Sequence, residues 1–320
     1  MNKRKEDEKQ FSEITMEELT EYSIKASPDF VAHLNELRED SKVAYADKLG
    51  ESAEAIGENN ESDLYNDFEL DYGDIVSIIG AGGKTSLMYE LARLAVKNEM
   101  RVLITTSTHI KKPSVADIQV FSEFGDLKET LRKDANSKIY AYSEILDGSE
   151  KFSAIDPDEI DLLKGDFDIF FIEADGAKRK SLKGWREFEP LIYPQSNKCI
   201  MVLPADYYGE KISAEDIFAN EIFEENFLPK NNIILEENGN GLKKKYLIDS
   251  EVYLNIIDST QGPFSKAENR SLYLYLSRSD LISREKLDNL LDELASGVKR
   301  RGYRDIKIVH SAGFSLETEH

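Results

Sequence analysis

Short apolar runs alternate with longer amphipathic segments along most of the chain after residue 67. The runs are rich in β-branched and aromatic residues, and we expect strands at residues 75–79, 101–106, 118–121, 139–142, 168–172, 200–203, 272–276 and 306–309. Apolar residues recur at helical spacing in three further segments, which predicts helices at 85–97, 127–132 and 284–298. Strands that alternate with helices predict an α/β fold with a mostly parallel sheet and flanking helices.

The first 66 residues follow a different pattern. Helical spacing predicts short helices at 16–24, 27–37 and 43–56, and the polar stretch 57–67 is typical of a linker. Residues 1–70 hold 19 acidic and 8 basic side chains, a net charge of −11. We therefore expect two parts, an acidic, partly helical N-terminal extension (1–66) and an α/β domain (67–320). Within that domain the pattern is weakest after residue 205, where we expect helices at 214–218 and 246–256.

Composition and charge exclude several classes of protein. Hydrophobic residues make up 40% of the chain, and no apolar run approaches the length that spans a bilayer. The first residues lack the apolar core of a secretion signal and Cys199 is the only cysteine, so we expect a cytoplasmic protein without membrane partners. The net charge of −21 argues against nucleic acid as a partner, because a surface that follows phosphates is basic. The sequence leaves the oligomeric state open.

A glycine-rich turn joins the strand at 75–79 to the helix at 85–97. It consists of Gly80, Ala81, Gly82, Gly83, Lys84, Thr85 and Ser86. Glycines let backbone N–H groups point at an anion, Lys84 adds a positive charge, and the Thr85 hydroxyl is suited to bind Mg²⁺. The full pattern G-x-x-x-x-G-K-[ST] would need glycine at position 78, where this chain has Ile78. The shorter form G-x-x-G-K-T, which resembles the loop of Mur-type ligases and folylpolyglutamate synthases, predicts a P-loop NTPase-like site for ATP or GTP.

Two carboxylates, Glu173 and Asp175, follow the most apolar predicted strand. Because ligands bind at the carboxyl ends of parallel strands, we expect both near Lys84. Our hypothesis is that Asp175 positions Mg²⁺ together with Thr85, while Glu173 orients water or an acceptor. Four positive charges follow within residues 178–183. Among them Arg179 and Lys183 are candidates to neutralise charge during transfer or to bind an anionic second substrate.

Two further segments offer contacts to a nucleotide. The strand at 101–106 ends in hydroxyls and an imidazole, of which Thr106 and His109 are candidate phosphate contacts. The strand at 272–276 is followed by Ser277-Arg278-Ser279-Asp280, the place where GTPases carry Asn-Lys-x-Asp. Only Asp280 matches, so it is the candidate base contact, and Arg278 is suited to stack on a base. The pattern does not separate adenine from guanine.

Together these motifs resemble the selenium-dependent hydroxylase accessory proteins of the YqeC type, over about residues 73–209. The likeness rests on Gly80–Ser86, Thr105–Ile110 and Glu173–Ala177, followed by Leu182-Lys183 and Glu189-Pro190. It implies a P-loop NTPase-like fold and a role in maturing selenium-dependent molybdenum hydroxylases, with the client enzyme or its cofactor as partner. The chain departs from the family pattern at 214–221, where Ala219-Asn220 stands in place of a His-Arg pair.

These observations favour an Mg²⁺-dependent NTPase that assists cofactor maturation. One alternative is an ATP-dependent ligase or kinase, because the short loop is shared with enzymes that pass the γ-phosphate to a small acceptor. Another is a nucleotide-switched binding module or chaperone, whose acidic N-terminal helices would contact a client.

Overall fold

The computed structural model describes residues 64–134, 136–145, 150–238 and 241–310. All of them belong to the unit that spans residues 61–320. The helices expected at 16–24, 27–37 and 43–56 lie outside the described residues. The division at residue 66 therefore stays a prediction.

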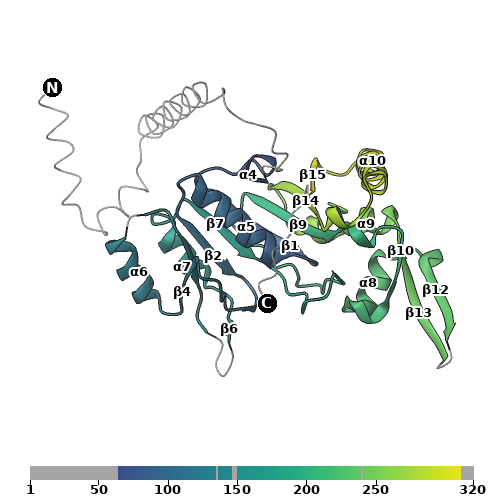
Figure 1. Cartoon of the computed structure of the whole chain (residues 1–320), viewed down its shortest axis with the longest axis horizontal. Helices are drawn as coiled ribbons and strands as arrows, with labels where there is room; N and C mark the ends of the chain where they lie inside the picture. Colours follow the sequence, from purple (N-terminus) through teal and green to yellow (C-terminus); the bar gives the residue numbers. More distant parts are fainter. Residues whose placement is uncertain (1–63, 135, 146–149, 239–240, 311–320) are drawn as a thin grey trace, which may run out of the picture. The chain divides into compact units, whose positions relative to one another are not determined.

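A sheet of eight parallel strands lies at the centre of this unit (Figure 1). From one edge to the other the strands are β15 (Ile306–His310), β14 (Ser271–Ser277), β9 (Lys198–Pro204), β1 (Ile75–Gly80), β7 (Ile169–Glu173), β2 (Val102–Thr106), β5 (Ile139–Tyr142) and β4 (Ile118–Phe121). Strands β1, β2, β5, β7 and β9 are buried along their whole length, which explains their continuous apolar runs. The predicted α/β fold and all eight predicted strands are confirmed.

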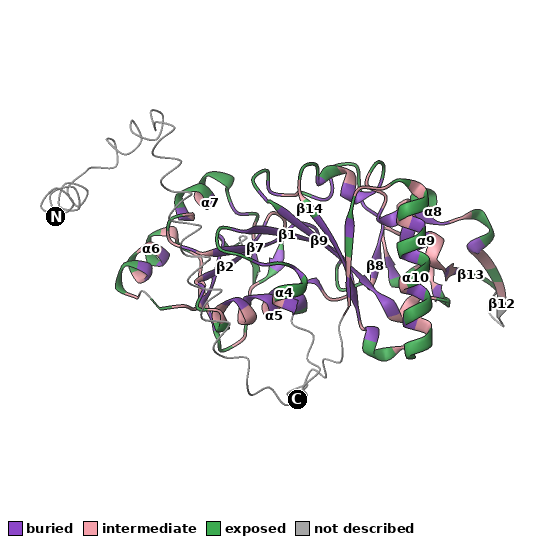
Figure 2. Ribbon diagram, turned by 90° about the horizontal axis from the view of Figure 1, so that it is seen from above, coloured by how far each residue is buried: buried purple, intermediate pink, exposed green. Residues whose placement is uncertain are grey.

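Helices cover both faces of the sheet, as the alternating pattern predicts. On one face, α4 (Leu64–Asp67) and α5 (Lys84–Lys97) pack against Val76 and Ile78 of β1. On the other face, α6 (Phe124–Lys133) and α7 (Pro157–Leu163) cover one half of the sheet. The second half is covered by α8 (Asn220–Phe227), α9 (Ser250–Ile256) and α10 (Arg284–Arg301). Figure 2 shows these helices with buried inner sides and exposed outer sides.

The order of the strands makes the carboxyl end of β1 the candidate position for a ligand. From β1 the chain runs through α5 to β2 on one side, and from β7 it crosses β1 to reach β9 on the other. Successive strands are thus added first on one side of β1 and then on the other, although all of them run parallel. In open α/β sheets ligands bind outside the carboxyl ends of the strands at such a switch point.

Smaller elements lie outside the central sheet, chiefly between β9 and α10. They comprise the strands β3 (Ile110–Lys111), β6 (Lys151–Phe152), β8 (Leu182–Lys183), β10 (Glu210–Ser213), β11 (Ile217–Phe218), β12 (Ile233–Asn238) and β13 (Gly241–Ile248), and the 3₁₀ turns η2 (Ala205–Tyr207), η3 (Ala214–Asp216), η4 (Lys230–Asn232), η5 (Pro263–Lys266) and η6 (Ser279–Leu281). Strands β12 and β13 form a hairpin that β10 extends.

Two predicted helices in this region are wrong in whole or in part. Residues 214–218 form the turn η3 and the strand β11, because Ile217 and Phe218 pair with β8 and satisfy their backbone there. Of the helix expected at 246–256, residues 246–248 belong to β13, where pairing on both sides outweighs helical spacing. The helix α9 begins only after Asp249, whose carboxylate accepts a hydrogen bond from Val252 N.

The end of the predicted linker is also structured. Residues 64–67 form α4, in which Leu64 is buried, and Phe68 packs edge-on against Tyr273 at 5.5 Å between ring centroids. The local pattern of this short segment is typical of a linker because polar residues surround its single buried leucine.

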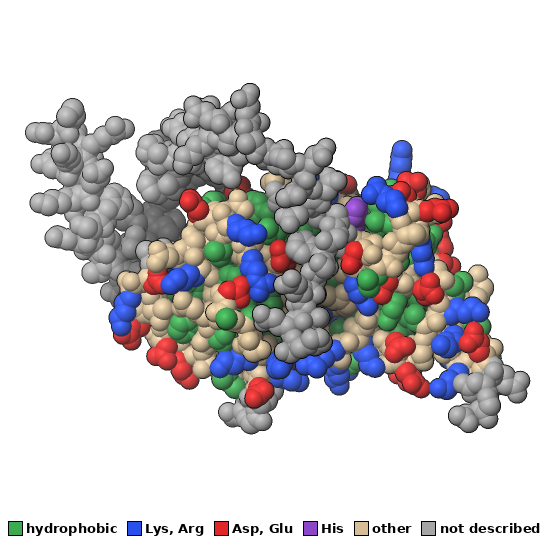
Figure 3. Space-filling model, in the orientation of Figure 1, with side chains coloured by type: hydrophobic (Ala, Val, Ile, Leu, Met, Phe, Trp, Pro, Cys, Tyr) green, Lys and Arg blue, Asp and Glu red, His purple; other side chains and the backbone are tan. Residues whose placement is uncertain are grey.

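Two expectations from composition concern the membrane and the distribution of charge on the surface. In the described part, no helix has both the length and the apolar character needed to cross a bilayer. Figure 3 shows Lys and Arg side chains gathered along the lower edge of the face in view, although the chain as a whole carries −21. The basic residues Lys178, Arg179 and Lys180 are all exposed. A locally basic surface therefore exists on an acidic chain.

Candidate functional site

The glycine turn after β1 adopts a backbone that only glycine reaches without strain. Gly80, Gly82 and Gly83 have φ values of +103°, +78° and +138°. Helix α5 begins directly afterwards at Lys84, and no side chain caps its first turn. The partial positive charge of a 14-residue helix therefore faces the crevice beside the turn, where it favours an anion.

The turn is fastened to the two strands on the far side of the switch point. Ala81 N donates to Val202 O of β9 at 2.9 Å, and Ser277 Oγ of β14 donates to Gly82 O at 2.7 Å. Because β9 approaches so closely, a Cβ atom on Gly80 would lie 2.2 Å from Val202 O. The segment that begins at Ser277 is the predicted contact for a nucleobase, and its serine also anchors the glycine turn.

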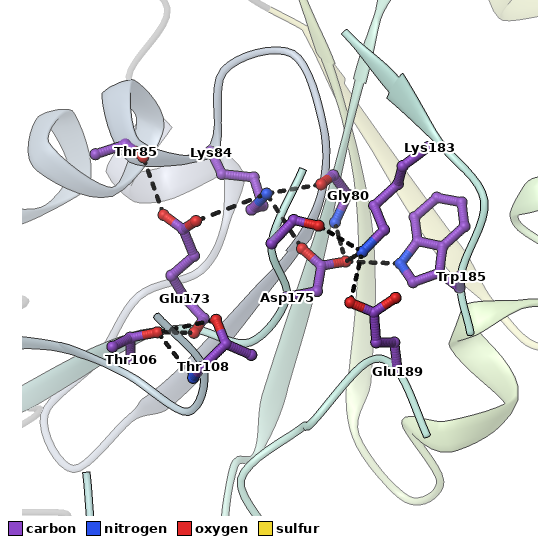
Figure 4. A network of polar contacts seen from close by, with 11 residues as sticks. Gly80, Lys84, Thr85, Thr106, Thr108, Glu173, Asp175, Lys183, Trp185 and Glu189 are labelled. Carbon is purple, nitrogen blue, oxygen red and sulfur yellow. Dashed lines mark hydrogen bonds and ion pairs between the residues drawn. The ribbon is translucent and has the colours of Figure 1, made fainter. Parts of the chain in front are cut away.

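The ammonium group of Lys84 lies between the two carboxylates that follow β7 (Figure 4). Its Nζ is 3.1 Å from Asp175 Oδ1 and 3.7 Å from Glu173 Oε1, and it donates to Gly80 O at 2.8 Å. Burial by itself lowers the pKa of Lys84, but the two carboxylates outweigh burial, so the pKa is raised and the charge is kept. Burial also raises the pKa of Glu173, although Lys84 and Thr85 oppose the shift.

The Thr85 hydroxyl pairs with Glu173 and not with Asp175. Thr85 Oγ1 donates to Glu173 Oε2 at 2.9 Å, and Thr85 itself is exposed at the open side of the helix. Thr106 fixes the same strand end, because its hydroxyl donates to Glu173 O at 2.9 Å. A hydroxyl and a carboxylate thus face the crevice together. Both are hard oxygen donors of the kind that Mg²⁺ prefers.

Asp175 occupies the buried side of the site. Its Oδ2 accepts hydrogen bonds from Gly80 N at 3.0 Å and from Trp185 Nε1 at 2.6 Å. Lys183 lies 3.5 Å from the same oxygen and 3.2 Å from Glu189 Oε1, and its side chain has no exposed surface. The carboxylate of Asp175 therefore joins the phosphate loop to a second, buried group of charges (Figure 4).

Sequence reasoning missed the part that Trp185 plays at this site. Trp185 is the only tryptophan of the chain and lies ten residues after Asp175. No local pattern connects an indole to a carboxylate at this separation. The only signal in the sequence is that Trp185 follows the acidic motif within ten residues.

Three predicted residues lie away from this cluster. Arg179 is exposed with a left-handed backbone (φ +61°), and His109 and Ser86 are exposed as well. Arg179 and His109 make no hydrogen bond or ion pair to the rest of the described chain. Their predicted roles in catalysis and phosphate binding stay predictions.

The segment after β14 brings a guanidinium to the phosphate loop. Arg278 Nη2 would lie 3.1 Å from a Cβ atom on Gly82, while Nη1 pairs with Asp206 Oδ2 at 3.3 Å. The guanidinium also stacks on Tyr207, with 5.3 Å to the ring centroid, and its Nε and Nη2 are buried without a hydrogen-bond partner among the described residues. Asp280, two residues further, is exposed.

Most residues of this site lie in a segment that matches one family model. Residues 76–221 match the family model described as "YqeC protein". This segment is similar to the YqeC family and makes up a little under half of the chain. Over 147 residues the chain is 35% identical to the "Uncharacterized protein YqeC" of Escherichia coli (strain K12), a match that covers 45% of this chain and 56% of that relative. The chain thus matches little more than half the length of this curated relative. No solved structure matches it significantly.

The YqeC match confirms the family resemblance found from the motifs. The YqeC segment contains the glycine turn, both carboxylates, Lys183, Trp185 and Glu189. Arg278 and Asp280 lie beyond it. The part of the site around Lys84 therefore lies within the matched segment. The part around Arg278, after β14, lies outside it.

Proposed function

We propose that this protein binds a nucleoside triphosphate with Mg²⁺ and hydrolyses it. The observation that carries the proposal is the position of Lys84, held at the amino end of α5 by Gly80 O and the carboxylates of Glu173 and Asp175. An ammonium, an uncapped helix end and left-handed glycines at one point suit the β- and γ-phosphates of a nucleotide. Because the chain resembles the YqeC family, we propose that it uses this activity in the maturation of a selenium-dependent molybdenum hydroxylase, in the cytoplasm.

Each residue of the cluster has a separate task. Lys84 and the loop amides bind the phosphates and neutralise charge as it develops during transfer. Thr85 and Glu173 would hold Mg²⁺, which neutralises phosphate charge when it is bound. Asp175 holds Lys84 and the first loop amide in place from the buried side. Because Thr85 contacts Glu173, we assign the carboxylate beside the metal to Glu173, in place of the Asp175 expected from sequence.

The nucleobase fits at the carboxyl end of β14. Strand β14 lies two strands from β1, and its end contacts the glycine turn directly, because Ser277 Oγ donates to Gly82 O at 2.7 Å. Arg278 would stack on the base or donate to the nucleoside, and the exposed Asp280 would accept hydrogen bonds from the base edge.

A thermal-shift screen of the full chain with ATP, GTP, ADP and GDP, with and without Mg²⁺, tests the proposal. A ligand at 100 times its Kd adds about 2.7 kcal/mol to the free energy of unfolding, and we expect at least one triphosphate to raise the Tm by several degrees. Inorganic phosphate release then separates hydrolysis from transfer, in which diphosphate appears without free phosphate. If none of the four nucleotides changes the Tm, the proposal is wrong.

The assignment of Glu173 to the metal side is open to a direct test. Glu173→Gln removes the charge next to Thr85 but keeps the shape, so we expect the Mg²⁺ concentration for half-maximal nucleotide binding to rise about tenfold or more. Asp175→Asn is the matched variant. It should lower the Tm, because Lys84 and Lys183 lose a buried partner, yet leave the Mg²⁺ midpoint within about threefold. The reverse pattern would restore the assignment of Asp175 to the metal.

A further inference from the structure

A cavity of about 440 Å³ lies on the far side of Trp185 from the phosphate loop. Trp185 and Glu189 form one part of its wall, the end of α8 at Phe227 another, and the segment 258–266 a third. A cavity of this volume is within the range that holds small molecules in proteins. The site described above does not use it.

Several donors of this wall make no side-chain hydrogen bond within the described residues, and the residues that carry them are exposed. The guanidinium of Arg186 lies over the rings of Phe188 and Phe218, at 5.9 and 5.5 Å, and makes no ion pair within the described residues. The side-chain amides of Asn226 and Gln261 make no hydrogen bond to other described residues. Lys266 Nζ donates to Glu187 O. Burial lowers the pKa of Lys266, and the carboxylates of Glu187 and Glu189 oppose that shift.

Two of the three carboxylates on the wall are already engaged. Glu189 pairs with Lys183 at 3.2 Å and accepts from Arg186 N at 3.1 Å. Asp258 accepts from Thr260 and from Gln261 N. The third carboxylate, that of Glu187, is exposed and lies near enough to Lys266 for its charge to raise the pKa of that lysine. The cavity therefore offers free donors, including the Arg186 fork, whose geometry matches a carboxylate or a phosphate.

We propose that this cavity binds a small molecule that carries an oxyanion, held by Arg186 and Lys266, and that Trp185 links its occupancy to Asp175. The indole ring faces the cavity and packs edge-on against Phe227 at 5.6 Å, while its Nε1 donates to Asp175 at 2.6 Å. A ligand that moves the ring changes the partner of the carboxylate that holds Lys84. The link to Lys84 rests on the proposed nucleotide site, whereas binding in the cavity does not.

The single tryptophan of the chain allows a direct test, because Trp185 lines the cavity and its fluorescence responds to changes around the indole ring. The full chain, without nucleotide, is titrated with orthophosphate, malonate and citrate at constant ionic strength, with sodium chloride as the control salt. We expect a saturable change of Trp185 emission with at least one oxyanion and none with chloride. Comparison of the phosphate arm with the two carboxylate arms identifies the preferred group. No saturable change with any of the three would overturn the proposal.

Variants separate the cavity from the phosphate loop, which also attracts anions. Arg186→Ala with Lys266→Ala should weaken oxyanion binding about tenfold or more, whereas the matched surface change Arg284→Ala should not. The cavity should still bind the oxyanion in Lys84→Met and after saturation with Mg²⁺-nucleotide, with an affinity shifted only through the link at Trp185. Binding that is lost with Lys84→Met but kept in the Arg186/Lys266 variant would place the anion in the phosphate loop and refute the cavity site.

Discussion

Replacing Lys84 with alanine is expected to lower the rate of NTP hydrolysis at least about 100-fold. The ammonium lies 3.1 Å from Asp175 and 3.7 Å from Glu173, and it is the cation nearest the uncapped first turn of α5. Without it the phosphates lose their main positive partner, and the two carboxylates repel them. The measurement is phosphate release at saturating nucleotide, together with nucleotide affinity from thermal shift.

The control for this variant is Lys97→Ala, which removes an exposed lysine from the last turn of the same helix. It should leave hydrolysis unchanged. Because Lys84 is buried between two acids, its removal also destabilises the fold, so far-UV circular dichroism and the Tm are measured alongside. Lys84→Met, which keeps the apolar stem of the side chain, serves if the alanine variant unfolds. Undiminished hydrolysis in a pure, folded variant would remove Lys84 from the mechanism.

Replacing Gly80 with alanine is expected to lower the free energy of unfolding by about 3 kcal/mol or more. The added Cβ would lie 2.2 Å from Val202 O and 2.8 Å from Val202 N, both atoms of the central strand β9. The backbone at Gly80 also has φ +103°, which L-residues rarely adopt. Relief of the clash requires β1 and β9 to separate at the phosphate loop, so nucleotide binding should weaken as well. Urea denaturation measures the loss.

Gly125→Ala is the matched control for this prediction. Gly125 lies in the first turn of α6, where a Cβ atom would have no described neighbour within 4 Å and the backbone is ordinary for a helix. Alanine there should be neutral or stabilising by up to about 1 kcal/mol, because it favours helix more than glycine does. Equal urea midpoints for the two alanine variants would show that β9 does not confine the loop as described.

Much of the fold followed from local patterns in the sequence. The continuous β-branched runs at β1, β2 and β7 marked strands buried on both faces, because no other arrangement hides so many apolar side chains in a row. Short strands outside the central sheet were harder to predict from the sequence. At β11 and β13 the backbone pairs with distant strands, and the helical spacing of a few residues there carried less weight than those hydrogen bonds.

The candidate site was predicted in its parts. The sequence placed Lys84, Thr85, Glu173 and Asp175 at strand ends, because glycine turns and acidic residues after apolar runs are local features. It did not predict how these residues pair. The pairing of Thr85 with Glu173, and of Asp175 with Lys183 and Trp185, depends on which strands are neighbours.

The sequence by itself thus determined the class of fold, the glycine turn after the first strand of the sheet and the segment that resembles the YqeC family, because each depends on residues close together in the chain. Only the tertiary structure decided that β7 and β9 flank β1, which sets Lys84 between two carboxylates and Ser277 against Gly82. The physical reason is that periodicity records whether a residue is buried, but not against which partner. The apolar pattern of a strand that is buried on both faces does not identify which other buried strand will be its neighbour in the sheet.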